Sequence, residues 1–292
     1  MKIQKFVLAL CCIAAMFIAG CGSSSTSSSS VSSNISGVFA DAQVVGLSYS
    51  CGGTTGVTQT GGAFTCPKNS TVTFTVGGVT ICSAPAQAFM TPVSCAQASA
   101  DPSANASTGS VVATAQFVIS IGTPVGTAPG TLSTLTITST EIQNAAGVSL
   151  DFSTATQAQL TAAVDTVNPG QSLVSAATAT NELTGTVVTN EAGNYSGSWS
   201  GCSGECSGTW TVTVDTSGNV SGSFAKTSGS GGGTGTISGN LVSGTTYSGT
   251  AGNSTWTGNV NTAQPPTTGT GPYLFSGTWT DTTQGTSGTF TN

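Results

Sequence analysis

The chain has 292 residues, of which only 5% are charged, and its formal net charge is −6 with four basic residues, ten acidic residues and no histidine. Without histidine there is no Ser-His-Asp or Cys-His catalytic unit and no histidine-ligated zinc, and so few cations argue against nucleic-acid binding. Solubility must come from serine, threonine, asparagine, glutamine and glycine, a composition typical of β-rich extracellular or periplasmic proteins.

The first 20 residues have the order of a signal peptide. Two lysines precede an apolar run that extends from Phe6 to about Ile18, and small residues follow it. The run is shorter than the roughly 20 apolar residues that a permanent membrane span needs. We therefore expect residues 1–20 to be a cleaved signal peptide. The alternative is an ordinary secretory signal that leaves Cys21 as a free thiol.

The segment Ile18-Ala19-Gly20-Cys21 resembles the lipobox of bacterial lipoproteins. The resemblance implies that the Cys21 thiol is acylated, becomes the mature N-terminus and binds the membrane through its acyl chains. The next residue is Gly22 rather than aspartate, which implies sorting to the outer membrane, with the protein facing the periplasm or the cell surface. Residues 21–36 are mostly serine, so we expect the lipidated cysteine to be followed by a disordered tether.

Residues 37–84 are expected to form a module of short β-strands. The expected strands are Val44–Tyr49, Ala63–Cys66, Thr71–Val76 and Val79–Cys82, with Gly77-Gly78 as a two-residue hairpin turn. The stretch Phe39–Tyr49, followed by Gly56-Val57-Thr58 and Gly61-Gly62-Ala63-Phe64, resembles an N-terminal β-module of bacterial envelope lipoproteins and is similar to transthyretin-like β-sandwich repeats. This resemblance implies a sandwich-like fold and brings no catalytic residues.

Residues 85–182 are expected to be a helical section. Apolar residues recur at helical spacing around Val111–Ile119 and again over Leu160–Val167, where Asn168-Pro169-Gly170 ends the pattern. A third helix is expected to start near Ser172, with Leu173, Val174 and Ala177 facing inward, and Leu135–Thr138 is expected as a strand. The apolar stripes of these helices are expected to pack in the core rather than to line a ligand pocket.

Residues 183–292 contain a repeated five-residue unit: apolar, Ser/Thr, Gly, small polar, apolar, with two looser copies. Its nine copies begin at Leu183, Tyr195, Cys206, Val220, Ile237, Tyr247, Trp256, Phe275 and Thr286. Because side chains alternate across a strand, the first, third and fifth residues share the inward face, where glycine leaves room for a neighbouring ring. The spacing predicts an antiparallel meander or small up-and-down barrel of roughly eight to ten strands, in a mainly β chain with a small helical section.

Six cysteines remain when the predicted signal peptide and Cys21 are set aside, and an even number suits an oxidising compartment. Cys202 and Cys206 are expected to form a local structural disulfide, with a redox-active pair as the alternative. The other four cysteines allow three pairings. The expected pairs are Cys51 with Cys66 and Cys82 with Cys95, since each closes a short loop. No metal site is expected.

Other residues have both a functional and a structural interpretation. Asp215–Asn219 and Glu191–Asn194 could supply oxygens to calcium, but tight hairpin turns are expected there. Tyr195 and four tryptophans could stack on sugar rings, whereas their inward positions favour core packing. These tryptophans are Trp199, Trp210, Trp256 and Trp279.

From these features we expect a lipid-anchored envelope protein that is not an enzyme and serves as a binding, adhesion or structural module displayed at the outer membrane. Its expected partners are the membrane and a glycan or another envelope protein, with no nucleic acid and no cofactor. The alternative, from a different class, is a carbohydrate-active or other carboxylate-dependent hydrolase whose acids lie in the mouth of the barrel.

Overall fold

The computed structural model describes residues 34–99, 101–125, 134–229, 233–243 and 245–292. The predicted signal peptide, the predicted lipidation site Cys21 and most of the predicted tether therefore lie outside the described residues. The end of the predicted tether was placed wrongly, because its last three residues belong to strand β1 (Asn34–Phe39). In that strand Ile35 pairs with Cys66, so ordered structure begins before residue 37.

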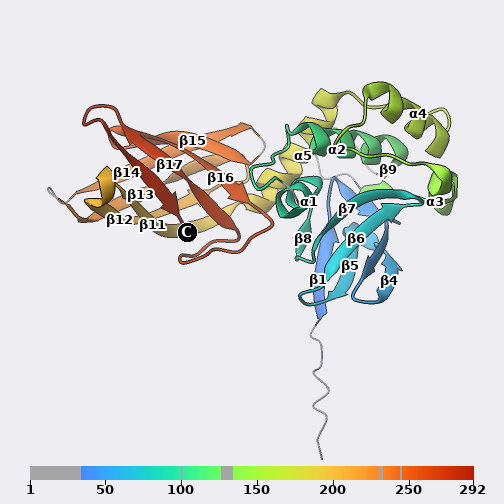
Figure 1. Cartoon of the computed structure of the whole chain (residues 1–292), viewed down its shortest axis with the longest axis horizontal. Helices are drawn as coiled ribbons and strands as arrows, with labels where there is room; N and C mark the ends of the chain where they lie inside the picture. The colour runs from blue at the N-terminus through green and yellow to red at the C-terminus, as the bar shows by residue number, and fades with distance from the viewer. Residues whose placement is uncertain (1–33, 100, 126–133, 230–232, 244) are drawn as a thin grey trace, which may run out of the picture. The chain divides into compact units, whose positions relative to one another are not determined.

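Ten short strands form three small sheets before the helices and between them (Figure 1). The sheet orders are β5-β1-β8, β4-β3-β6-β7 and β2-β10-β9. The strands after β1 are β2 (Gln43–Val45), β3 (Ser48–Cys51), β4 (Thr54–Val57), β5 (Ala63–Pro67), β6 (Thr71–Val76), β7 (Val79–Pro85), β8 (Phe89–Met90), β9 (Thr123–Val125) and β10 (Thr134–Thr136). A single 3-10 turn, Thr60–Gly62, precedes β5.

The sequence predicted β5, β6, β7 and β10 and misjudged one segment that it treated as a single strand. The Gly77-Gly78 turn is confirmed, since Val76 pairs directly with Val79. The expected strand Val44–Tyr49 is wrong, because the chain breaks into β2 and β3 at Gly46. That glycine has φ +86°, and a Cβ there would lie 2.0 Å from the carbonyl oxygen of Ile137. A tertiary contact therefore interrupts a segment whose local pattern favoured a continuous strand.

The N-terminal β-structure extends beyond residue 84. Strand β1 pairs in parallel with β8, and β2 pairs in parallel with β10, whose Leu135 lies opposite Val44. One apolar core connects these sheets to the helices: Phe39 and Phe74 are fully buried with ring centroids 4.7 Å apart, and Phe117 of the second helix belongs to the same core. Strands and helices therefore share this core, and a second, separate apolar cluster lies among the helices.

Five α-helices lie in the described part of the chain: α1 (Pro92–Ser99), α2 (Gly109–Ile121), α3 (Ser139–Asn144), α4 (Gln157–Val167) and α5 (Ala176–Glu191). A 3-10 turn, Ala145–Gly147, follows α3. Helices α2 and α4 confirm the helical spacing, whereas α1 and α3 were not predicted. Helix α5 starts after its N-cap Ser175, so the predicted start near Ser172 was early. Ala177 is exposed, and Ala179 is the buried alanine instead.

The C-terminal part is a closed barrel of eight antiparallel strands in sequential order, drawn from yellow to red in Figure 1. Its strands are β11 (Gly193–Gly201), β12 (Cys206–Val214), β13 (Asn219–Ser228), β14 (Thr234–Ser243), β15 (Thr246–Ala251), β16 (Ser254–Asn261), β17 (Leu274–Asp281) and β18 (Thr286–Thr291). Eight of the nine predicted units each occupy one strand. The ninth, Leu183–Val187, was wrongly predicted as a strand, since it lies in α5 and the barrel begins at Gly193.

Candidate functional site

The interior of the barrel follows the alternation that the sequence predicted. In β12 every second residue from Cys206 to Val214 is buried, and the residues between them are exposed or half-buried. The outward residues are mainly serine and threonine, which hydrogen-bond between neighbouring strands, as Ser207 does with Ser228 at 2.7 Å. The outer surface is therefore solvated by hydroxyl groups, and the large apolar side chains are directed into the barrel.

Glycine at the centre of the repeat makes room for the rings. A Cβ atom at Gly239 would lie 2.6 Å from Cζ2 of Trp256, and a Cβ at Gly258 would lie 2.6 Å from Cζ of Phe290. Contacts this short are not found for real Cβ atoms, so any larger residue would force the ring to move. The glycines thus let aromatic rings from other strands lie against the barrel wall.

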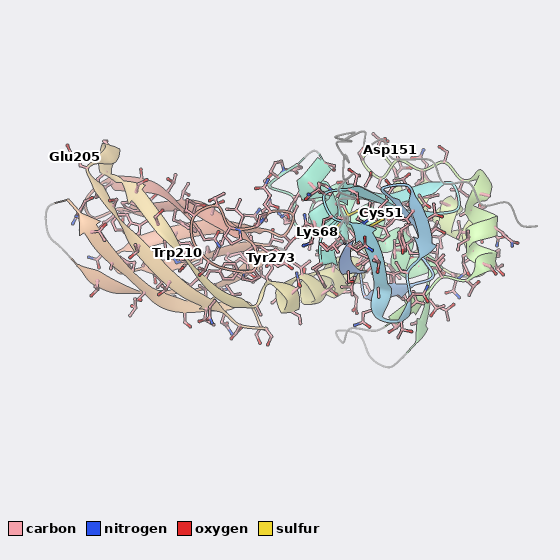
Figure 2. All side chains as sticks on the ribbon, turned by 90° about the horizontal axis from the view of Figure 1, so that it is seen from below. Cys51, Lys68, Asp151, Glu205, Trp210 and Tyr273 are labelled. Atoms are coloured by element: carbon pink, nitrogen blue, oxygen red, sulfur yellow. A yellow bond between two sulfur atoms is a disulfide. The ribbon has the colours of Figure 1, made fainter. Side chains whose placement is uncertain are left out.

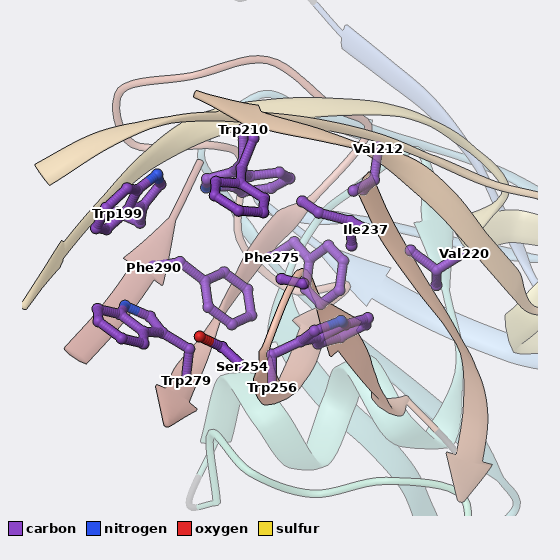
Figure 3. Close-up of a pocket in the computed structure, with 12 residues that line it drawn as sticks. Trp199, Trp210, Val212, Val220, Ile237, Ser254, Trp256, Phe275, Trp279 and Phe290 are labelled. Carbon is purple, nitrogen blue, oxygen red and sulfur yellow. The ribbon is translucent and has the colours of Figure 1, made fainter. Parts of the chain in front are cut away.

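The aromatic side chains do not fill the barrel. A cavity of about 110 Å³ remains in its interior (Figure 3). All eight strands contribute to the lining, and all four tryptophans of the chain take part. The lining residues are Trp199, Trp210, Val212, Val220, Phe224, Ile237, Ala251, Ser254, Trp256, Phe275, Trp279 and Phe290. Because native interiors leave few voids larger than a water molecule, this cavity is the candidate binding site of the barrel.

The rings around the cavity contact one another edge to face. Trp199 and Trp279 have ring centroids 5.6 Å apart and planes at 87°. Phe290 meets Trp210 at 5.7 Å and 82°, and Trp256 at 6.1 Å and 85°. This is the geometry that the aromatic quadrupole favours. The wall of the cavity is therefore built from ring faces and edges that can make the same contacts with a planar ligand.

Polar groups of the lining are few, and the side-chain hydroxyl of Ser254 is the main one. No hydrogen bond of this hydroxyl is present in the described part of the chain, and Figure 3 shows it directed among the rings. The indole N–H groups of Trp199 and Trp279 are buried without an acceptor. By contrast, the indole of Trp210 donates to the carbonyl oxygen of Ser198 at 3.1 Å. Unused hydrogen-bonding capacity is thus concentrated around Ser254, Trp199 and Trp279.

The two ends of the barrel differ. Near the β11–β12, β15–β16 and β17–β18 turns, Trp199 and Trp279 are only partly buried, so we call this end the mouth. At the other end Tyr195 and Tyr247 are buried and contact Phe275, with ring centroids 5.5 and 5.8 Å away. Figure 2 shows the order along the barrel, with Glu205 at the mouth, Trp210 at mid-height and Tyr273 toward the opposite end. We call this opposite end the floor.

The floor contains a buried carboxyl group. Glu191, the last residue of α5, has no exposed surface, and its Oε2 accepts a hydrogen bond of 2.7 Å from the Tyr247 hydroxyl. Its Oε1 has no partner. Burial raises the pKa of the Glu191 carboxyl well above its usual range, and the hydrogen bond from Tyr247 opposes this only in part. The C-terminal end of a helix also disfavours a negative charge, so the position of Glu191 at the end of α5 likewise opposes ionisation of its carboxyl group.

Sequence reasoning missed the burial of Glu191 and predicted a tight hairpin turn for Glu191–Asn194, which is wrong because α5 runs directly into β11 at Gly193. A signal was available in the spacing of the residues. Leu183, Val187 and Glu191 recur every four positions, which places them on one face of a helix. The strand-like unit at Leu183 concealed this pattern.

The other predicted turn and the disulfides are present. The side-chain amide of Asn219 donates to Asp215 Oδ2 at 2.9 Å, and the backbone N–H groups of Ser217 and Asn219 donate to Oδ1, both at 2.8 Å. These bonds, the first most strongly, lower the pKa of the Asp215 carboxyl. The three disulfides are Cys51–Cys66, Cys82–Cys95 and Cys202–Cys206. Cys51–Cys66 joins the ends of β3 and β5, Cys82–Cys95 joins β7 to α1, and Cys202–Cys206 closes the β11–β12 turn at the mouth.

The described residues contain no cluster of three or more cysteine, aspartate or glutamate side chains that could hold a metal ion. Within the same ranges, none of the helices combines the length and the apolar character that crossing a membrane would require. Comparisons of the chain with protein-family models, with curated proteins and with solved structures find no match.

Proposed function

We propose that this chain is a lipid-anchored protein of the bacterial envelope whose C-terminal barrel binds a small apolar molecule without catalysing a reaction. The observation that supports binding is the aromatic cavity of about 110 Å³ inside the barrel. An eight-stranded barrel has an interior that is either filled by side chains or left open for one small ligand. The lining residues favour an interior that is left open for one small ligand.

The cavity forgoes packing contacts that a filled barrel interior would make. Cavities left in protein cores destabilise by about 24 cal/mol per Å³. For 110 Å³ this corresponds to about 2.6 kcal/mol, since 110 × 24 is about 2,600 cal/mol. A ligand that fills the space restores these contacts and stabilises the protein further by mass action. Retention of so large a void in a barrel rich in aromatic residues supports a binding role.

Binding is favoured over hydrolysis because no carboxylate belongs to the lining in the described part of the barrel. Asp281 on β17 lies at the mouth, but its Oδ1 accepts hydrogen bonds from the backbone N–H groups of Thr283 and Gln284. Glu191 lies below Tyr195 and Tyr247 at the floor. A pair of carboxylates placed on the two sides of a bound glycosidic bond, which glycosidases use, has no counterpart in this cavity.

The anchor is the second element of the proposal, and it rests on the lipobox-like segment that ends at Cys21. Acyl chains contribute about 0.8 kcal/mol for each buried methylene, so two or three chains hold a protein on a membrane essentially permanently. The barrel would then be displayed at the outer membrane, where a glycan or another envelope protein remains a candidate partner. Cys21→Ala should block lipid labelling and release the protein to the soluble fraction. Retention of this variant on the membrane would refute the anchor.

Binding is tested with the full chain and a panel of apolar compounds of different shapes, comprising rings, alkyl chains and fused rings. Because all four tryptophans line the cavity, tryptophan emission reports on its occupancy. We expect at least one class to change this emission and to raise the melting temperature. A carbohydrate panel with a hydrolase assay serves as the comparison. Turnover abolished by one aspartate or glutamate substitution would overturn the nonenzymatic assignment.

A further inference from the structure

We infer that the ligand is a neutral compound with a single ring and one polar substituent, bound with the ring among the tryptophans and the substituent toward the Ser254 hydroxyl. This inference rests on the proposed function, because it specifies the class of molecule that the barrel binds. It is drawn from the size, the shape, the charge and the polar groups of the cavity.

The size of the cavity limits the ligand to about one ring. An engineered apolar cavity of about 150 Å³, lined by aliphatic and aromatic side chains, binds benzene. The cavity described here has about 110 Å³ and lies next to the partly buried Trp199 and Trp279, where a substituent can extend toward the mouth. A long acyl chain or a sugar of several rings exceeds this space. The expected ligand therefore has fewer than about ten heavy atoms.

The shape of the wall favours a planar ring. Seven of the twelve lining residues are aromatic, and the contacts between them have planes at 71° to 85° where they surround Phe275 and Phe290. A planar ligand adds one more member to this edge-to-face arrangement, with each aromatic pair contributing beyond the area that it buries. An alkyl chain of equal size gains only the free energy of burying its apolar surface.

The charge of the lining favours a neutral ligand. No charged side chain lines the cavity in the described part of the barrel, and burial of an ionised group without a partner is strongly unfavourable. Three charged residues lie in the strand ends and turns at the mouth but not in the lining. They are Glu205, Lys226 and Asp281. An organic anion that reached Lys226 is the competing possibility, and the test includes one.

The polar groups of the cavity determine the orientation of the bound ligand. Strand register places Ser254 opposite Asp281 and Trp256 opposite Trp279, so Ser254 lies one inward position closer to the mouth than the Trp256–Trp279 pair. The indole N–H groups of Trp199 and Trp279, which have no acceptor, lie on the same side of the cavity. The inner part, formed by Val212, Ile237 and Phe275, is apolar. A hydroxyl or carbonyl substituent therefore faces the mouth.

The test uses calorimetric titration of the full chain with four probes: p-cresol, toluene, octanol and benzoate. We expect p-cresol to bind about fivefold more tightly than toluene, the factor of a typical hydrogen bond. Octanol and benzoate are each expected to bind at least tenfold more weakly than p-cresol. Ser254→Ala should remove the preference for p-cresol over toluene and leave toluene binding unchanged. Thr255→Ala, an exposed outward position on the same strand, is the matched control and should bind all probes as the wild type does.

Ala251→Leu adds three carbon atoms to the lining and should weaken the binding of every probe that contains a ring. This result would show that the probes bind in the cavity. Equal or tighter binding of octanol or benzoate, still weakened in Ala251→Leu, would overturn the ligand class and leave the proposed binding function standing. An unchanged p-cresol preference in Ser254→Ala would overturn the orientation. Absence of binding by every apolar probe to the folded wild type would instead refute the binding function itself.

Discussion

Asp41 allows a quantitative test of how burial controls the stability of this chain. It lies in the turn between β1 and β2 without exposed surface, and neither carboxyl oxygen has a hydrogen-bond partner among the residues that the structure describes. Burial raises the pKa of its carboxyl from 3.8 to about 7, and the nearby Glu182 carboxylate raises it further. Asp41→Asn removes the ionisable group with almost no change in volume.

The size of the effect follows from the two pKa values of Asp41. Their difference is 7 − 3.8, about 3 units, and one unit corresponds to about 1.4 kcal/mol. Between about pH 4 and pH 7 the folded chain keeps a proton that the unfolded chain has lost, so the free energy of unfolding falls as the pH rises through this window. Above pH 7 the full penalty of about 4 kcal/mol applies, and below about pH 4 it vanishes.

Urea unfolding followed by circular dichroism at pH 4, 6 and 8 measures this effect. We expect Asp41→Asn to match the wild type at pH 4 and to exceed it by up to about 4 kcal/mol at pH 8, less the cost of the buried amide. Glu182→Gln should also raise the free energy of unfolding at pH 8, but by less, because it removes only the repulsion from the Glu182 carboxylate and leaves Asp41 buried. A constant difference between the wild type and Asp41→Asn across the pH series would refute the reasoning.

Two further predictions concern the barrel. Gly235→Ala should destabilise by about 1–3 kcal/mol in urea unfolding because its Cβ would meet the Phe224 ring, whereas Gly233→Ala, with no atom within 4 Å of its Cβ, should change little. Equal losses in the two variants would contradict the role of Gly235 in leaving room for the Phe224 ring. Glu191→Gln removes an acid whose folded pKa is raised, so it should lessen the fall in the free energy of unfolding as pH rises above the usual carboxyl range. If the free energy of unfolding of Glu191→Gln depended on pH as that of the wild type does, burial would not raise the pKa of Glu191 as described.

The glycine-centred repeat links the fold of the barrel to its proposed function. Each unit places a glycine between two inward side chains, and at several of these glycines a ring from another strand occupies the adjacent space, as Phe290 does at Gly258. Rings from strands that are not adjacent meet inside the barrel, as Trp210 of β12 does with Phe275 of β17 at 5.9 Å, and the cavity lies beside these rings. A barrel with a Cβ at every inward position would push the rings toward the centre and close the cavity.

Much of this architecture could be predicted because the signals are local. Alternation of inward and outward residues has a period of two, so Tyr195, Gly197 and Trp199 could be assigned to one face of β11 without knowledge of the neighbouring strands. The short loops between paired cysteines made Cys51–Cys66 and Cys82–Cys95 the favoured pairings in the same way.

The errors arose where one local pattern fits two structures. Leu183 and Val187 are four positions apart, which places them on one face of a helix and also on one face of a strand. The Ser175 N-cap and the buried Ala179 extend a helix through this segment, and the tertiary context therefore decides in favour of α5. At Gly46 the approach of Ile137, 91 positions further along the chain, breaks a strand that the local sequence would continue.

The sequence by itself determined that glycine-centred units form antiparallel strands with large apolar residues on one face and hydroxyl groups on the other, because side-chain alternation depends only on the order of residues. It predicted nine such strands, and the structure has eight of them. Only the tertiary structure decided that the strands close into a barrel, that the rings leave about 110 Å³ unfilled and that Glu191 is buried beneath them. These features depend on the tilt of each ring and on the helix that meets the floor, which are set by contacts between residues distant in the chain.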